Sequence, residues 1–203
     1  MEADWEVEVG GDAPVIDALW PGFIDLRWTA PSSGDFAARA RSLPEGIQLP
    51  ALAVALERLN SPHSPVWTSK CDFWPALQPE DFDPDELDAP TGCSAHAVGG
   101  YIDLLPKSDQ KWSDQKWSDQ QWSFPGGVEE RCKELCARLR AAPQRCCRVD
   151  LIVRHALIAP DVLDMGITAY FTACGATPAE ATRTLEAGLS AFVDVLCPDS
   201  TLQ

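Results

Sequence analysis

The sequence predicts a single α+β domain over residues 1–203, built as a two-layer sandwich with helices on one face of a mixed or antiparallel sheet. From residue 22 the expected elements run strand, helix, strand, strand, helix, strand. This is the order of a ferredoxin-like split βαβ unit, here extended by a C-terminal strand and helix. A chain of 203 residues can bury a core of its own without a disulfide or a metal.

A short internal repeat supports this topology. The segment Gly22-Phe23-Ile24-Asp25-Leu26 recurs as Gly100-Tyr101-Ile102-Asp103-Leu104. In a split βαβ unit these segments are the two central, neighbouring strands, so residues 22–74 and 100–158 are interpreted as duplicated halves. Asp25 and Asp103 are then expected on adjacent strands of one sheet.

Hydrophobic periodicity and helix-end signals place the elements of the N-terminal half. Trp5, Val7 and Val9 alternate with acidic residues, as in a half-exposed strand. Pro50 suits the first turn of a helix that ends at Asn60. The strands are expected at 5–9, 23–28 and 66–74, and the helices at 35–42 and 50–60.

The C-terminal half carries stronger signals. Val149, Leu151 and Val153 alternate with polar residues, and Thr177-Pro178-Ala179-Glu180 combines a capping box with a first-turn proline. Gly99 and Gly100 lie inside a strand pattern, which suggests a bulge or a close backbone approach. The strands are expected at 95–105, 146–158 and 166–174, and the helices at 127–142 and 177–197. The last strand is expected to extend the sheet by a hairpin, with the last helix over the same face.

A low-complexity stretch separates the two halves. Lys111-Trp112-Ser113-Asp114-Gln115 is repeated at 116–120 and again, truncated, at 121–123. Tryptophans five residues apart share neither a helix face nor a strand face. Residues 107–127 are therefore interpreted as a loop with a tandem duplication, which costs little closure entropy. A tryptophan platform for sugar or peptide is the alternative.

The charge balance restricts the classes of partner. The chain has 31 acidic and 16 basic residues and a net charge of −15, with about two-thirds of the acids but only half of the bases before residue 126. Nucleic acids and anionic membranes are disfavoured as partners, because both require a basic face. No apolar run is long enough to span a membrane, and residues 1–6 do not resemble an export signal, so a cytoplasmic location is expected.

Eight cysteines are expected to be reduced thiols, mostly buried, because disulfides are rare in the cytoplasm. No metal or other cofactor is predicted. The alternative is a zinc site, for which Cys93, His96, Cys132 and Cys136 would supply four suitable ligands.

The densest acidic feature is the segment Glu80–Asp88, with six acids in nine residues. Asp83-Pro84-Asp85-Glu86 has the order of an N-cap, first-turn proline and capping glutamate. A calcium loop is disfavoured, because Glu86 stands where such a loop needs glycine and Gly92 where it needs glutamate. The segment is expected to be an exposed turn that steers a basic partner, with an apolar anchor at its centre. The predicted partner-binding residues are Asp81, Phe82, Asp83, Asp85, Glu86 and Asp88.

Few residues are available for catalysis. His155 alternates with core residues, His63 lies in a proline-rich turn, and no nucleophile elbow, phosphate loop or His-Glu-x-x-His motif is present. The chain is therefore predicted not to be an enzyme. The expected function is a non-catalytic acidic binding protein, such as a cytoplasmic inhibitor or a toxin-neutralising immunity protein that covers a basic site. The alternatives are a small ferredoxin-like enzyme, for instance with Cys71 or Cys93 paired with His96, a ligand-binding domain, and the zinc protein.

Overall fold

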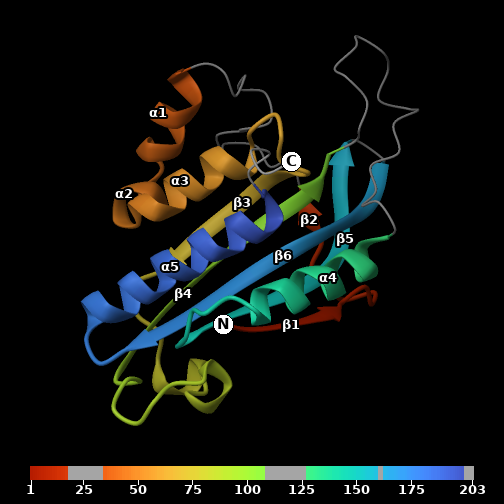
Figure 1. Ribbon diagram of the computed structural model, residues 1–203. Helices are drawn as coiled ribbons and strands as arrows, with labels where there is room; N and C mark the ends of the chain where they lie inside the picture. The colour runs from red at the N-terminus through yellow and green to blue at the C-terminus, as the bar shows by residue number, and fades with distance from the viewer. Residues whose placement is uncertain (18–33, 108–126, 160–161, 199–203) are drawn as a thin grey trace.

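The computed structural model describes residues 1–17, 34–107, 127–159 and 162–198 (Figure 1). In this part of the chain six strands form one sheet in the order β1-β5-β6-β4-β3, with β2 also paired to β5. The strands are β1 (Glu2–Val7), β2 (Ile16–Asp17), β3 (Val66–Trp74), β4 (His96–Pro106), β5 (Cys147–Ala159) and β6 (Val162–Gly175). The helices are α1 (Gly34–Ser42), α2 (Pro44–Gln48), α3 (Pro50–Leu59), α4 (Val128–Arg140) and α5 (Pro178–Leu196), with 3₁₀ turns at Pro79–Asp81 and Asp85–Leu87.

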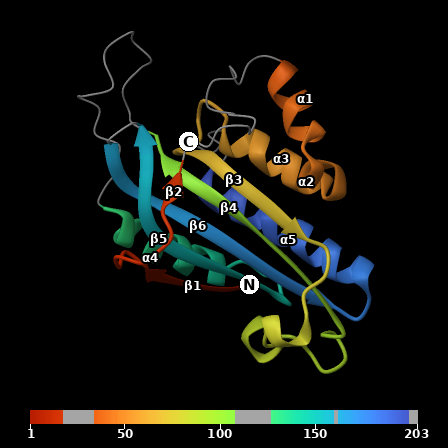
Figure 2. The ribbon, with the colours of Figure 1, turned by 180° about the vertical axis from the view of Figure 1, so that it is seen from behind.

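The sheet is mixed: β1 and β2 run parallel to β5, and the other neighbours are antiparallel. The helices lie on one face of the sheet, and the opposite face is seen from behind (Figures 1 and 2). The mixed α+β architecture is therefore confirmed. No helix in the described residues is long and apolar enough to cross a membrane.

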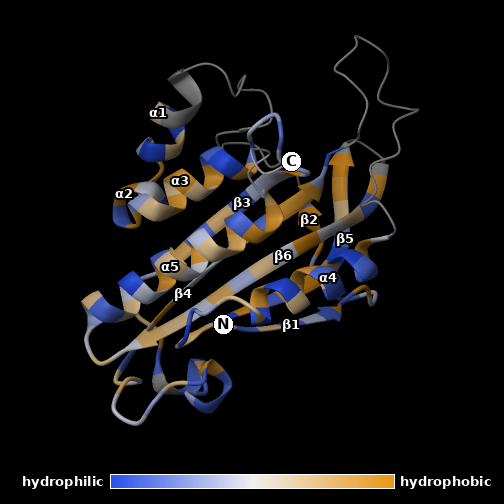
Figure 3. Ribbon diagram, viewed as in Figure 1, coloured by the Kyte–Doolittle hydropathy of each residue, from blue (hydrophilic) through white to orange (hydrophobic). Residues whose placement is uncertain are grey.

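The main core lies between the sheet and the helices. Val149, Leu151 and Val153 of β5 are fully buried, as their alternation predicts. Helices α4 and α5 bury stripes spaced three or four residues apart, which are Cys132, Leu135, Cys136 and Leu139, and Leu185, Leu189, Phe192 and Leu196. The ribbon of β5 and β6 is coloured mostly as hydrophobic, whereas the 79–88 segment is largely hydrophilic (Figure 3).

Most expected elements are confirmed, with ends that differ by at most four residues. Thr177 caps α5, and its hydroxyl oxygen accepts a hydrogen bond from the Glu180 N–H at 3.2 Å. The close backbone approach expected at the glycine pair is present at Gly100, because a Cβ there would lie 2.5 Å from the Asp72 carbonyl oxygen of the neighbouring strand. The register irregularity of this strand pair lies in β3, between Thr68 and Cys71.

The position of β6 differs from the expectation. This strand was predicted to extend the sheet, but it lies inside it, between β5 and β4. Both hairpin pairing with β5 and a long antiparallel ladder with β4 hold it there. The predicted neighbour of β4, residues 23–28 with Asp25, lies outside the described residues, as do most of residues 107–127. The complete ferredoxin-like unit therefore stays a prediction.

Candidate partner-binding surface

The acidic segment forms a turn docked on one end of the sheet. Leu87, only 2% exposed, packs with Ala97 of β4 and Cys174 of β6, and Phe82 is half-buried against the same cluster. Phe82 therefore contacts the protein's own core. The five predicted acids of the turn are all exposed.

Four of the five predicted acids also hold the turn in place. The Asp81 carboxylate accepts a hydrogen bond from the Gln78 N–H at 3.0 Å, and that of Asp83 accepts one from the Asp85 N–H at 2.9 Å. Two ion pairs connect the turn with the start of β5: Asp88 with Arg145 at 3.0 Å, and Glu86 with Arg148 at 3.3 Å. The fifth predicted acid is Asp85, whose side chain makes no hydrogen bond or ion pair of this kind within the described residues.

The sheet face opposite the helices carries an aromatic cluster that the sequence analysis did not identify. Trp74 of β3, Tyr101 of β4 and Tyr170 of β6 have ring centroids 5.8–6.5 Å apart. Each ring is half-buried. Gly99 leaves room for the Trp74 indole, since a Cβ there would lie 3.2 Å from Trp74 Cε3. We call this cluster the aromatic trio.

The register of the strands places carboxylates around the aromatic trio. Residues in register across a sheet point to the same face. One row across the strands reads Asp4, Asp150, Tyr170, Tyr101 and Asp72. Neighbouring positions on the same face carry Glu2, Glu6, Glu8 and Asp103. We call the trio and these acids the open face.

Described residues cover the open face only towards its two ends. At one end Ile16 of β2 packs with Trp67, Leu105, Ala156 and Ile158. At the other end lies the Leu87 cluster of the acidic turn. Its middle, with the aromatic trio, is not overlaid by any described helix, as the view from behind shows (Figure 2).

Arginines join the acids into one surface. Arg148 contacts both Asp150, at 2.8 Å, and Glu86 of the turn, so it connects the open face with the acidic turn. Arg154 donates to the Glu8 carboxylate at 2.6 Å and to the Tyr170 hydroxyl at 3.0 Å, and its guanidinium lies 5.5 Å from the Tyr170 ring centroid. Arg154 and Glu8 are 146 residues apart in the sequence, so no local sequence pattern indicates that they form this contact.

Asp103 lies deepest in the open face. It is 6% exposed, and its carboxylate accepts a hydrogen bond from the Thr168 hydroxyl at 2.7 Å. Burial raises the pKa of the Asp103 carboxyl, and the Thr168 bond, Lys70 and Arg154 oppose that rise in pKa only in part.

We expect Asp103→Asn to flatten the pH dependence of stability. A carboxyl whose pKa is higher in the folded than in the unfolded chain binds more protons when folded, so the free energy of unfolding falls as pH rises through the interval between the two values. That loss begins near the unfolded pKa of about 3.9. The amide keeps the acceptor for Thr168 but does not ionise. Urea unfolding from pH 3.5 to 7.5 should show the variant gaining on the wild type as pH rises, and parallel profiles would contradict this.

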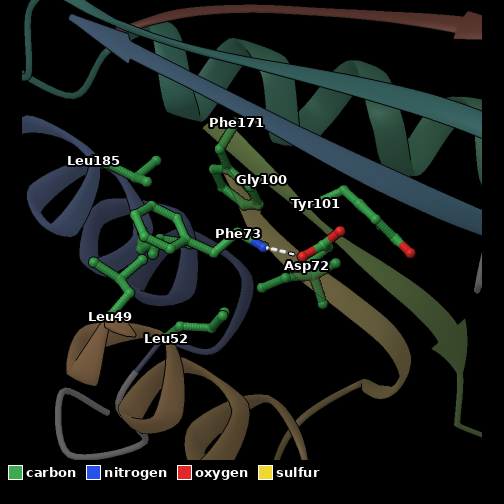
Figure 4. Close-up of a pocket in the computed structure, with 10 residues that line it drawn as sticks. Leu49, Leu52, Asp72, Phe73, Gly100, Tyr101, Phe171 and Leu185 are labelled. Carbon is green, nitrogen blue, oxygen red and sulfur yellow. Dashed lines mark hydrogen bonds between the residues drawn. The ribbon is translucent and has the colours of Figure 1, made fainter. Parts of the chain in front are cut away.

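A small pocket lies in the other layer, between the sheet, α3 and α5 (Figure 4). Its cavity volume is about 10 Å³, and its lining is mostly apolar, including Leu49, Leu52, Phe73, Phe171 and Leu185. The Asp72 carboxylate shown there accepts a hydrogen bond from the Phe73 N–H at 2.7 Å. Ligand sites are usually about 300–1,000 Å³ with converging polar groups, so this pocket gives no support to a ligand-binding domain.

The residues considered for zinc or catalysis are dispersed. Cys132 and Cys136 lie buried on the core face of α4, and the described residues contain no group of three or more potential metal ligands. The four residues considered for zinc, Cys93, His96, Cys132 and Cys136, therefore form no such group in the described part of the chain. Burial, assisted by Glu45, raises the pKa of Cys71 to about 12, which opposes a thiolate nucleophile at that position. His155 is half-buried and His63 exposed.

Comparison with known proteins found no match: no family model, no curated protein and no solved structure matches the chain.

Proposed function

We propose that the protein is a non-catalytic binding protein whose open face and acidic turn cover a basic surface of a protein partner. The observation that carries this proposal is the aromatic trio, half-exposed and surrounded by carboxylates. A cytoplasmic inhibitor or a toxin-neutralising immunity protein is the kind of protein that suits this surface.

The two parts of the surface have different roles in this proposal. Tryptophan and tyrosine are enriched among the residues that dominate binding energy, near the centre of an interface. Carboxylates around them accelerate encounter with a basic partner and reject acidic ones. Arg148 keeps the open face and the acidic turn together as one continuous surface.

The same charges argue for a protein rather than a nucleic acid. Sheets that bind single-stranded RNA also present aromatic rings, but they combine them with basic residues that contact phosphates. Here the row through Tyr170 and Tyr101 contains Asp4, Asp150 and Asp72. These carboxylates would repel a phosphate backbone.

The test begins with the partner. The immobilised wild-type protein is used to capture proteins from the source organism, and the captured protein is then purified for binding kinetics. We expect a basic protein whose association rate falls steeply between 50 and 300 mM salt, because the encounter depends on charge. Trp74→Ala should raise Kd about 30-fold or more, the effect of losing a central aromatic residue worth about 2 kcal/mol.

Charge-reversal variants distinguish an effect of the acids on the association rate from an effect on folding. Glu80 and Asp85 are exposed and no side-chain contact ties either to the rest of the described structure, so Glu80→Lys with Asp85→Lys should slow association about tenfold at low salt without changing Tm. Glu129→Lys with Glu130→Lys makes the same change of net charge on α4, on the other layer, and should slow association less than twofold. Equal effects of both pairs, or salt-independent binding, would contradict the proposed surface.

A further inference from the structure

Two cysteines, Cys146 and Cys174, lie together beneath the acidic turn, at the end of the sheet where β5 begins and β6 ends. Cys147 pairs in register with Ala173, so the preceding residue, Cys146, lies opposite Cys174. The Cys174 N–H donates to the Cys146 carbonyl oxygen at 3.0 Å, and Cys146 packs against the cluster that contains Cys174. Cys93, on the connection into β4, is close enough to influence both electrostatically.

The three thiols differ in access to solvent. Cys174 is fully buried under Leu87, whereas Cys146 and Cys93 are half-buried. Cys146 has a positive φ of 58°, which takes it out of regular strand geometry at the entrance to β5. Cys146 is therefore more accessible to a small reagent than Cys174.

Cys146 is the member best placed to act as nucleophile. Cys174 is fully buried, and burial raises its pKa to about 11, whereas Cys146 is only half-buried. Burial also raises the pKa of Cys146, and Arg145, the preceding residue in the chain, opposes part of that rise. The thiolate is consequently a minor species at neutral pH, and its reactions should accelerate as pH rises.

We propose that Cys146 and Cys174 form a redox modification site that peroxide converts into a disulfide across the β5–β6 ends. The Cys146 thiolate attacks one oxygen of hydrogen peroxide, the O–O bond breaks, and sulfenic acid and water result after protonation. The Cys174 thiol then attacks the Cys146 sulfur, forming the S–S bond and releasing the second water. Both sulfurs are oxidised, and one peroxide supplies the two-electron oxidant.

The placement distinguishes this site from the other five thiols. Cys132, Cys136 and Cys147 lie buried in the main core, and Cys71 and Cys197 are half-buried at separate positions. The hydrogen bond from the Cys174 N–H to the Cys146 carbonyl oxygen keeps the two backbones adjacent, and a disulfide bridges Cα atoms about 4.4–6.8 Å apart. Cys93 is the natural competitor for either sulfur.

The experiment treats the full-length protein with hydrogen peroxide at pH 7 and pH 8.5, blocks the remaining thiols and maps disulfides by mass spectrometry. We expect the free-thiol count to fall from eight to six, with Cys146 joined to Cys174, and the rate to be at least threefold higher at pH 8.5. Reductant should restore all eight thiols.

Variants identify the bond, because Cys146 and Cys147 fall in one tryptic peptide. Cys147→Ala and Cys93→Ser should both still form it, whereas Cys146→Ser and Cys174→Ala should each abolish it while circular dichroism confirms folding. A disulfide that contains Cys93 or Cys147 in the wild type, or a bond that survives Cys146→Ser, would overturn the assignment. So would the absence of any disulfide at both pH values.

Discussion

Phe192→Ala is expected to lower the free energy of unfolding by about 3–5 kcal/mol, the usual cost of truncating a fully buried phenylalanine. Phe192 is 0% exposed and contacts Phe171 of β6 edge to face, with ring centroids 5.1 Å apart and planes at 87°. The pair joins α5 to the centre of the sheet. Removing one ring leaves a cavity between two elements that cannot close together, because each is held by several other contacts.

Urea or guanidinium unfolding monitored by circular dichroism measures this loss. Val54→Ala is the matched control, because Val54 lies on α3 and is 51% exposed. Its stability should change by no more than about 0.5 kcal/mol, as at other exposed positions. A loss below 1 kcal/mol for Phe192→Ala would contradict the packing of α5 described above.

Gly188→Ala is expected to destabilise the protein, although alanine is the better helix former. An added Cβ would lie 2.4 Å from the Cys147 sulfur, so α5 and β5 would have to separate or the buried thiol would have to move. Overpacking of this kind costs about 1–3 kcal/mol, and the gain in helix propensity is about 1 kcal/mol. The clash is therefore expected to outweigh the gain in propensity, with a net loss of up to about 2 kcal/mol.

A second substitution tests the cause. In the Cys147→Ala background the sulfur is absent and the nearest atom left is the residue 147 Cβ, 3.6 Å away, so Gly188→Ala should become neutral or stabilising. Ser190→Ala, on the exposed side of the same helix, measures propensity alone and should stabilise slightly. Additive effects of the Gly188 and Cys147 substitutions would show that the two side chains do not compete for space.

Local patterns in the sequence predicted most helices and strands. Thr177 and Glu180 marked the start of α5, and the spacing of Cys132, Leu135, Cys136 and Leu139 marked the buried side of α4. These signals involve residues within one or two turns, so they do not depend on the rest of the fold. The two-residue strand β2 was missed, because its pairing with β5 has no periodicity of its own.

The candidate surface was only half predictable. The exposed acids of the 80–88 turn follow from composition, but the docking of Leu87 and the ion pairs with Arg145 and Arg148 require the neighbouring strands. In the aromatic trio, Tyr101 and Asp103 alternate with the buried Ile102 and Leu104, which indicates a polar strand face. Nothing local indicated that Trp74 and Tyr170 would lie on either side of Tyr101.

By itself the sequence determined the α+β class, the acidic character, the exposed turn and which side of each main helix and strand is apolar. These properties depend on composition and short-range periodicity. Only the tertiary structure decided that β6 lies between β5 and β4, and hence that Tyr170 joins Tyr101 and Trp74 among carboxylates. Several strand orders bury the same apolar faces, and the choice among them depends on hydrogen bonds and packing between residues far apart in the chain.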